Sequence, residues 1–200
     1  LVHKLCSLPC PMALEGFELP SAVTAIFVLH YIFVDTFAVG AARTPYQLKY
    51  PFTTETHDAK NLEPFIRALR AQQNQVEQAW AFFLVQWVCA FSLDPTFAGA
   101  NGLLWVVARM AYGYIYRVNP SRNKLMLTTI PAYLAQTLCC GGILTACLMP
   151  WTSRGISIGI ASGVCVVFAI YGWSIYRPWF GNFVSEEKKR QEGQLMSSSD

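Results

Sequence analysis

The stretch "RALRAQQNQVEQAWAFFLVQWVCAF" (67–91) changes character half-way along its length. Its first half is rich in charged and amide side chains, and its second half is almost entirely apolar. No proline or glycine interrupts it, so we expect one continuous helix over about residues 62–92. With a rise of about 1.5 Å per residue, the polar part would project roughly 12 Å into water before the helix enters lipid. The stretch therefore predicts a transmembrane helix with a polar end.

The composition of the whole chain agrees with a membrane protein. The 200 residues are 54% hydrophobic and only 14% charged, whereas soluble domains carry about 25% charged residues. The net charge of +3 is too small to indicate nucleic-acid binding. Seven cysteines are present, but no spacing among them is typical of a zinc site.

Five stretches are long and apolar enough to span a bilayer, which takes about 20 residues. We therefore expect an all-α integral membrane protein, with a four-helix transmembrane bundle over 21–149 and a fifth, C-terminal transmembrane helix within 150–184. A short N-terminal segment (1–20) and a polar, disordered tail (185–200) complete the chain. The expected spans are 21–42, about 71–93, about 97–118, about 125–149 and 155–176.

The distribution of lysine and arginine predicts the orientation of these spans. Twelve of these residues fall on one side, in the loops after the first and third spans and after the fifth. Only Lys4 and Arg154 fall on the other side, and Arg109 lies within a span. We expect the basic loops in the cytosol, or in the matrix or stroma of an organelle, with the N-terminus opposite. The chain would then reside in the endoplasmic reticulum or another organelle membrane.

Polar residues with helical spacing share one face on each of two neighbouring spans. Charged groups in a bilayer normally face the interior of a bundle or a wet cavity. Pairing of Glu77 with Arg109, or of Asp35 with Arg109, would account for the charges without a ligand. The excess of cations favours an acidic ligand, since arginine binds carboxylates in a bidentate manner. The residues are Arg70, Asn74 and Glu77 on the second span and Arg109, Tyr112 and Tyr116 on the third.

These two faces resemble a known family. "RAQQNQVE" (70–77) is similar to the second-helix signature of the MAPEG family, the membrane-associated proteins in eicosanoid and glutathione metabolism. "ARMAYGYIYR" (108–117) is similar to its third-helix pattern. The family includes the microsomal glutathione S-transferases and the glutathione-conjugating leukotriene synthase. The resemblance covers about residues 21–149.

The resemblance implies a glutathione site between neighbouring subunits of a trimer, near the cytosolic face. Glutathione, the co-substrate, has two carboxylates for arginines, an amine for a glutamate, and amides for asparagine and tyrosine. No metal is implied. The residues that the resemblance assigns to glutathione are Arg43, Arg70, Gln72, Asn74, Glu77, Arg109, Tyr112 and Tyr116.

The implied chemistry is activation of the glutathione thiol, whose thiolate a nearby cation stabilises. In the family an arginine just beyond the third helix has this role. Here the loop reads "NPSRNK" (119–124), so Arg122 is the first catalytic candidate and Lys124 the second. Ordinary enrichment of basic residues in a cytosolic loop is the alternative explanation for both residues.

Two classes of function follow from these patterns. The first is a glutathione transferase or peroxidase that acts on a lipophilic electrophile or lipid hydroperoxide in lipid metabolism. The second is a non-catalytic scaffold or accessory subunit of a larger membrane complex, which the fifth span favours. Gln78 stands where the leukotriene synthase has a tyrosine that touches glutathione, which bears on activity more than on the fold. His30, in the first span, is most simply a packed bundle histidine.

Overall fold

The computed structural model describes residues 16–48, 62–118, 121–171 and 174, and in these ranges the chain is helical apart from short turns, with no strand. The first helix has three successive parts, which are α2, a π-helical segment η1 and α3. A final helix, which we call the C-terminal helix, covers Arg154–Tyr171. The elements before the C-terminal helix are, in chain order, α2 (Glu18–His30), η1 (Tyr31–Thr36), α3 (Phe37–Arg43), a short 3₁₀ turn η2 (Thr44–Tyr46), α4 (Glu63–Ser92), α5 (Pro95–Val118) and α6 (Arg122–Leu148).

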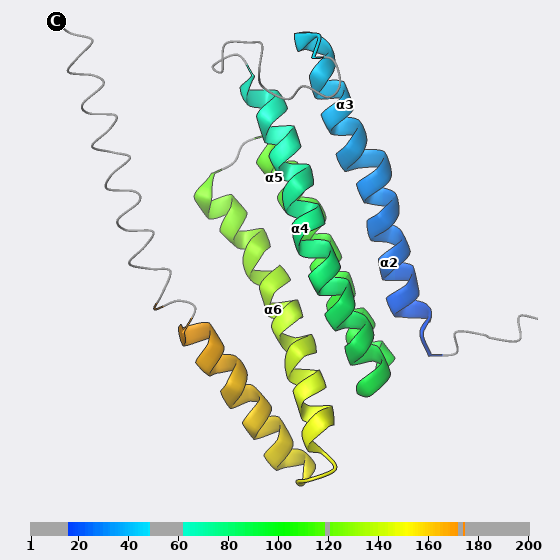
Figure 1. The fold of residues 1–200 in the computed structure, drawn as a ribbon, viewed down its shortest axis with the longest axis vertical. Helices are drawn as coiled ribbons and strands as arrows, with labels where there is room; N and C mark the ends of the chain where they lie inside the picture. Colours follow the sequence, from blue (N-terminus) through cyan, green and yellow to red (C-terminus); the bar gives the residue numbers. More distant parts are fainter. Residues whose placement is uncertain (1–15, 49–61, 119–120, 172–173, 175–200) are drawn as a thin grey trace, which may run out of the picture.

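The helices run up and down, side by side, as Figure 1 shows. α2, η1 and α3 form one continuous rod, and α5 packs against α2, α4 and α6. The C-terminal helix folds back beside α6 after a short turn. At one end of the bundle α3 ends, α4 begins, α5 ends and α6 begins. We call it the basic end, because Arg43, Arg67, Arg117 and Lys124 lie there.

The turn between α4 and α5 is encoded locally. The backbone N–H of Phe97 donates to Asp94 Oδ1 at 2.6 Å, so Asp94 caps the start of α5. Pro95 occupies the first helical position, where its fixed φ is favourable and no backbone donor is needed. The helix expected over 62–92 is confirmed as Glu63–Ser92.

The core of the bundle is aromatic. The rings of Phe82 and Trp105 stack with centroids 4.2 Å apart and an interplanar angle of 3°, and Phe27 lies 5.4 Å from the same Trp105 ring. Both Phe82 and Trp105 are almost fully buried. Because Trp105 lies one turn before Arg109, this cluster fixes the position of α5 beneath the polar residues described below.

The π-helical segment changes which face of the first helix is buried. Before it, Val23 and Phe27 face the core at regular α-helical spacing. Continuing that spacing at 3.6 residues per turn would bring Val34 inward, yet Val34 is exposed and Asp35 is buried. The wider π turn thus advances the inward face by one residue, and Asp35, Val39 and Arg43 follow one another along it.

Three helical stretches are long and apolar enough to cross a membrane, within the residues described. They are Glu18–Tyr46, Asn123–Leu148 and Arg154–Tyr171. α4 and α5 are long enough, at 30 and 24 residues, but polar residues such as Gln75, Gln86 and Arg109 lie within them. The chain is therefore an all-helical membrane protein, and spanning by α4 and α5 stays a prediction.

Candidate functional site

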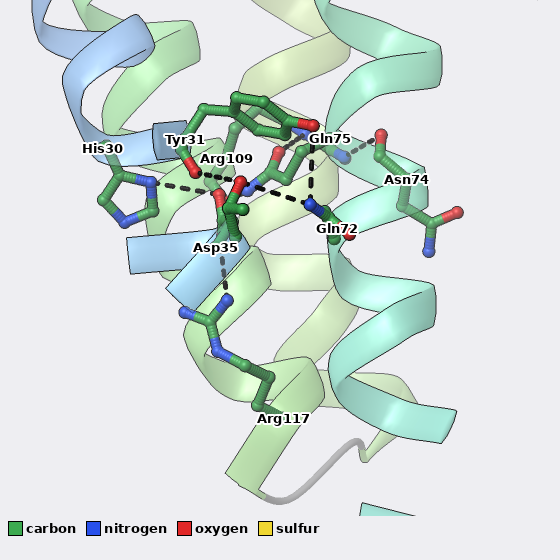
Figure 2. Close-up of polar contacts among 9 residues, drawn as sticks. His30, Tyr31, Asp35, Gln72, Asn74, Gln75, Arg109 and Arg117 are labelled. Atoms are coloured by element: carbon green, nitrogen blue, oxygen red, sulfur yellow. Dashed lines mark hydrogen bonds and ion pairs between the residues drawn. The ribbon is translucent and has the colours of Figure 1, made fainter. Parts of the chain in front are cut away.

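Arg109 lies buried between α4 and α5, where a reciprocal set of hydrogen bonds holds it. Its Nε donates to Gln75 Oε1 at 2.9 Å, and its Nη2 donates to the carbonyl oxygen of Asn74 at 2.6 Å. Gln75 Nε2 donates in return to the carbonyl oxygen of Arg109 at 2.7 Å. Figure 2 shows the two side chains facing each other across the helix interface. The guanidinium is therefore fixed in place, with Nη1 making no hydrogen bond within the described residues.

Two tyrosines continue this arrangement along α5. The guanidinium carbon of Arg109 lies 4.5 Å from the centre of the Tyr112 ring, a distance that allows a cation–π interaction. Asn74 Nδ2 donates to the Tyr112 hydroxyl at 3.2 Å. The rings of Tyr112 and Tyr116 lie 5.7 Å apart. The structure thus brings together four of the predicted site residues, which are Asn74, Arg109, Tyr112 and Tyr116.

Arg70 and Glu77 lie elsewhere on α4. Both side chains are exposed, and with Gln73 they form a polar face that points away from the rest of the chain. The same face continues with Trp80, which is 69% exposed. Residues of this face can therefore meet a ligand from outside the single chain, but they do not enclose one by themselves.

The other predicted residues have separate positions. Gln72 turns toward the first helix, where its Nε2 donates to Thr36 Oγ1 at 3.2 Å and to the Tyr31 hydroxyl at 3.5 Å. Arg43 is buried, with its guanidinium carbon 5.1 Å from the centre of the Phe65 ring. Lys124 is exposed near the start of α6. Arg122 is the first residue of α6, but its side chain lies outside the described residues.

A second polar cluster lies beside the first and was not predicted as a site. Asp35 is 0% exposed, and its Oδ1 accepts a hydrogen bond from Arg117 of α5 in an ion pair. Asp35 Oδ2 lies 3.2 Å from His30 Nδ1, within ion-pair distance but not aligned as a hydrogen bond. Figure 2 shows Asp35 between these two residues. The π-helical segment makes this possible, because it turns Asp35 inward.

Gly113 marks the point at which the two clusters meet. A Cβ at this position would lie 2.9 Å from Gln75 Nε2 and 3.4 Å from Asp35 Oδ1. A side chain here would therefore crowd the Gln75 amide and would also contact the Asp35 carboxylate. The polar core of the bundle is thus continuous from Arg117 through Asp35 to Gln75 and Arg109.

Gln75 is the residue that sequence reasoning missed. It has a detectable signal, since it follows Ala68 and Ala71 along one side of α4 and precedes Phe82, all of them buried. An amide within an otherwise apolar, inward-facing stripe has to find a polar partner. That partner is Arg109.

The charge pattern differs from both simple pairings considered above. In the part of the chain that the structure describes, Asp35 pairs with Arg117 and His30, and Glu63 pairs with Arg67. No ion pair joins Arg109 to Glu77 or to Asp35 there, so both of those pairings are wrong. Arg109 is only 5% exposed, and the groups to which it donates hydrogen bonds are neutral. An anion supplied from outside the chain would complete its environment.

No cluster of His, Cys, Asp or Glu in the described ranges could hold a metal ion.

Comparisons with known proteins add independent findings. The model of the MAPEG family matches residues 21–149. An uncharacterised protein of Synechocystis sp. is 35% identical over 97 residues. Microsomal glutathione S-transferase 2 of Mus musculus is 30% identical over 103 residues. Each match covers 48% of this chain and 66% of the relative, so the chain spans just under two thirds of the length of these relatives.

Proposed function

Because this chain belongs to the MAPEG family, we propose that it is a membrane-bound glutathione transferase or peroxidase. The observation that carries the proposal is Arg109, a buried cation whose hydrogen-bond acceptors are neutral, beside Tyr112 and Asn74. A mammalian relative is a glutathione transferase by name. Glutathione supplies the missing anion, with two carboxylates for arginines and an amine for a glutamate.

The exposed polar face of α4 supports a site shared between copies of the chain. Arg70 and Glu77 are exposed, and Trp80 and Leu84 extend the same face with 69% and 60% exposure. Charged side chains that faced lipid would cost several kcal/mol. We therefore expect this face to pack against a neighbouring subunit of a homotrimer, with glutathione between Arg70 and Glu77 of one chain and residues of the next.

The reaction needs a thiolate. Arg122 is the first candidate to stabilise it and Lys124 is the second, and both residues lie where α6 begins at the basic end. The cation stabilises the thiolate, and the thiol proton passes to solvent. In a transferase reaction the thiolate sulfur forms a bond to an electrophilic carbon of the lipophilic substrate. The bond from that carbon to its leaving group, or to the oxygen of an epoxide ring, breaks, and the departing atom takes the electrons of that bond. In a peroxidase reaction two glutathiones reduce one lipid hydroperoxide, giving the disulfide, the lipid alcohol and water.

Titration calorimetry of the detergent-solubilised protein with glutathione tests the proposal. We expect saturable binding at up to millimolar glutathione. Replacing Arg70 with Ala should weaken it about 10- to 100-fold, because a hydrogen bond to a charged group is worth about 1.5–3 kcal/mol. The matched control is Gln73→Ala, on the same exposed face, which should bind like the wild type. If the helical, unmodified protein shows no binding heat at millimolar glutathione, the proposal fails and the scaffold function is favoured.

The activating residue can be separated from the binding residues. We expect Arg122→Ala to reduce the ultraviolet absorbance of bound thiolate about tenfold, equivalent to one unit in the thiol pKa, while glutathione affinity changes little. Lys124→Ala, two residues along the chain, serves as the matched comparison. A loss with Lys124→Ala and none with Arg122→Ala would reassign the role to Lys124. Unchanged absorbance in both variants would contradict activation from this end of α6.

A further inference from the structure

A groove separates α6 from the C-terminal helix, outside the site described above. Its volume is about 590 Å³, within the range of roughly 300–1,000 Å³ that small-molecule sites occupy. Its walls are mainly apolar, with Ile143 and Leu144 on α6 and Val164 and Phe168 on the C-terminal helix. Both walls belong to helices that are long and apolar enough to cross a membrane. The groove therefore opens to the hydrocarbon of a bilayer.

The groove has a closed end and an open end. Near the turn that joins the helices, Ser157 and Ala161 are buried, and Ser157 Oγ lies 2.6 Å from Thr152 Oγ1 in a hydrogen bond. Farther along, Cys165 Sγ contacts the carbonyl oxygen of Thr137 at 3.9 Å. Figure 1 shows the C-terminal helix leaning away from α6 with distance from the turn. The axes of the two helices thus diverge toward the basic end of the bundle.

The polar side chains that line the groove lie farther from the turn than most of the apolar ones on α6. Tyr133, Gln136 and Thr137 line it near the middle of α6, and the apolar Ile143 and Leu144 line it nearer the turn. Cys140 and Cys165 between them behave as small apolar residues. An amphipathic molecule would therefore enter with its apolar end toward the turn.

Other occupants fit less well. A second helix is about 10 Å across, so 590 Å³ would hold little more than a single turn of it. The tail "SEEKKRQEGQLMSSSD" (185–200) is charged and then serine-rich, which does not suit apolar walls. A flexible hydrocarbon chain, by contrast, is narrow, apolar and abundant on the open side of the groove.

We propose that the groove binds one acyl chain of a bilayer phospholipid, inserted from the basic end with its methyl terminus near Ile143 and Val164. The lipid fills the space between two helices that diverge, and so holds the C-terminal helix against α6. The proposal does not depend on glutathione binding. One wall of the groove, on α6, lies within the family match, and the other wall, the C-terminal helix, lies beyond residue 149, where that match ends.

Photo-crosslinking tests the proposal in the intact protein, reconstituted into nanodiscs with a phosphatidylcholine that carries a photoactivatable group near the end of one chain. Peptide mapping should place the adducts in 133–144 and 164–169. Val164→Trp fills the groove and should lower the adduct yield about tenfold, which corresponds to about 1.4 kcal/mol. Val167→Trp on the same helix is the matched control, because Val167 is exposed and does not line the groove, and it should leave the yield unchanged.

Two outcomes would overturn the proposal. One is an even distribution of adducts around the lipid-facing surface, with equal yields from Val164→Trp and Val167→Trp. The other is a lack of adducts in 133–144 and 164–169 while other lipid-facing residues are labelled, which would show that lipid does not occupy the groove. If Val164→Trp does not fold, Ala169→Leu narrows the same groove with a smaller side chain and is judged by the same criteria.

Discussion

Replacing Arg117 with Met is expected to lower the free energy of unfolding by about 3–5 kcal/mol, since it leaves a buried charge without its partner. Asp35 is fully buried, and Arg117 of α5 is its cationic partner, while His30 lies 3.2 Å away on the other side. Reversible unfolding in mixed micelles of SDS and dodecyl maltoside, followed by helicity, measures the loss.

Two further variants make this prediction specific. Arg67→Met removes an exposed pair with Glu63 one turn away, and such surface pairs contribute only about 0.2–1 kcal/mol. The double variant Asp35→Leu with Arg117→Met replaces the buried pair by apolar side chains, which is often close to neutral. We expect it to recover most of the stability. Equal losses for Arg117→Met and Arg67→Met would show that Asp35 does not need Arg117.

The second large effect is expected for Gln75→Leu, with a loss of about 2–3 kcal/mol, because hydrogen bonds to charged groups contribute about 1.5–3 kcal/mol. The variant keeps the approximate side-chain volume but removes the acceptor for Arg109 Nε and the donor to the Arg109 carbonyl. Glutathione affinity should fall as well, since Arg109 is no longer held toward Tyr112. The same unfolding assay and a calorimetric titration measure the two effects.

Gln73→Leu is the matched control for Gln75→Leu. It makes the same substitution two residues earlier, on the exposed face of α4. Its effect on the free energy of unfolding should be clearly smaller than that of Gln75→Leu, because Gln73 makes no contact with Arg109. If both variants lose the same stability, the loss comes from the amide composition of α4 and not from the contact with Arg109.

The approximate positions of the described helices could be predicted from the sequence because their signals are local. The polar-to-apolar change over 67–91 indicated α4, and Asp94 with Pro95 marked the start of α5. The apolar stretches before and after them gave the first helix, α6 and the C-terminal helix. The two sequence motifs also indicated the family, which the match over 21–149 confirms.

The contacts of the site could be predicted only in part. Helical spacing grouped Asn74 with Arg70 and Glu77 on one face and Tyr112 with Arg109 on another, and the structure joins Asn74 to Tyr112 by a hydrogen bond. Spacing cannot tell which side of a helix faces its neighbour, and here Arg70 and Glu77 point outward. The inward partner of Arg109 is instead Gln75, because the buried stripe of α4 passes through that position.

The pairing of Asp35 with Arg117 could not be predicted, for a geometric reason. Regular α-helical spacing from Val23 and Phe27 directs Val34 to the core and leaves Asp35 beside it. No residue in "YIFVDT" (31–36) is a signature of π-helical geometry. The wider turn forms where Thr36 Oγ1 donates to the carbonyl oxygen of Tyr31, five residues back, at 3.0 Å. The contact of Asp35 with Arg117 of α5 is tertiary, so the local sequence does not reveal it.

The π-helical segment also affects how this chain should be aligned with its relatives. In a relative whose first helix is regularly α-helical, the inward positions stay in step with Val23 and Phe27 along the whole helix. A gap-free alignment would then set Asp35 opposite a lipid-facing residue and shift Val39 and Arg43 by one position. Against such a relative, the correct correspondence would need a one-residue gap within the first helix, at 31–36. A role transferred to a residue after this segment, such as that of Arg43, would then come from a position shifted by one residue in the relative.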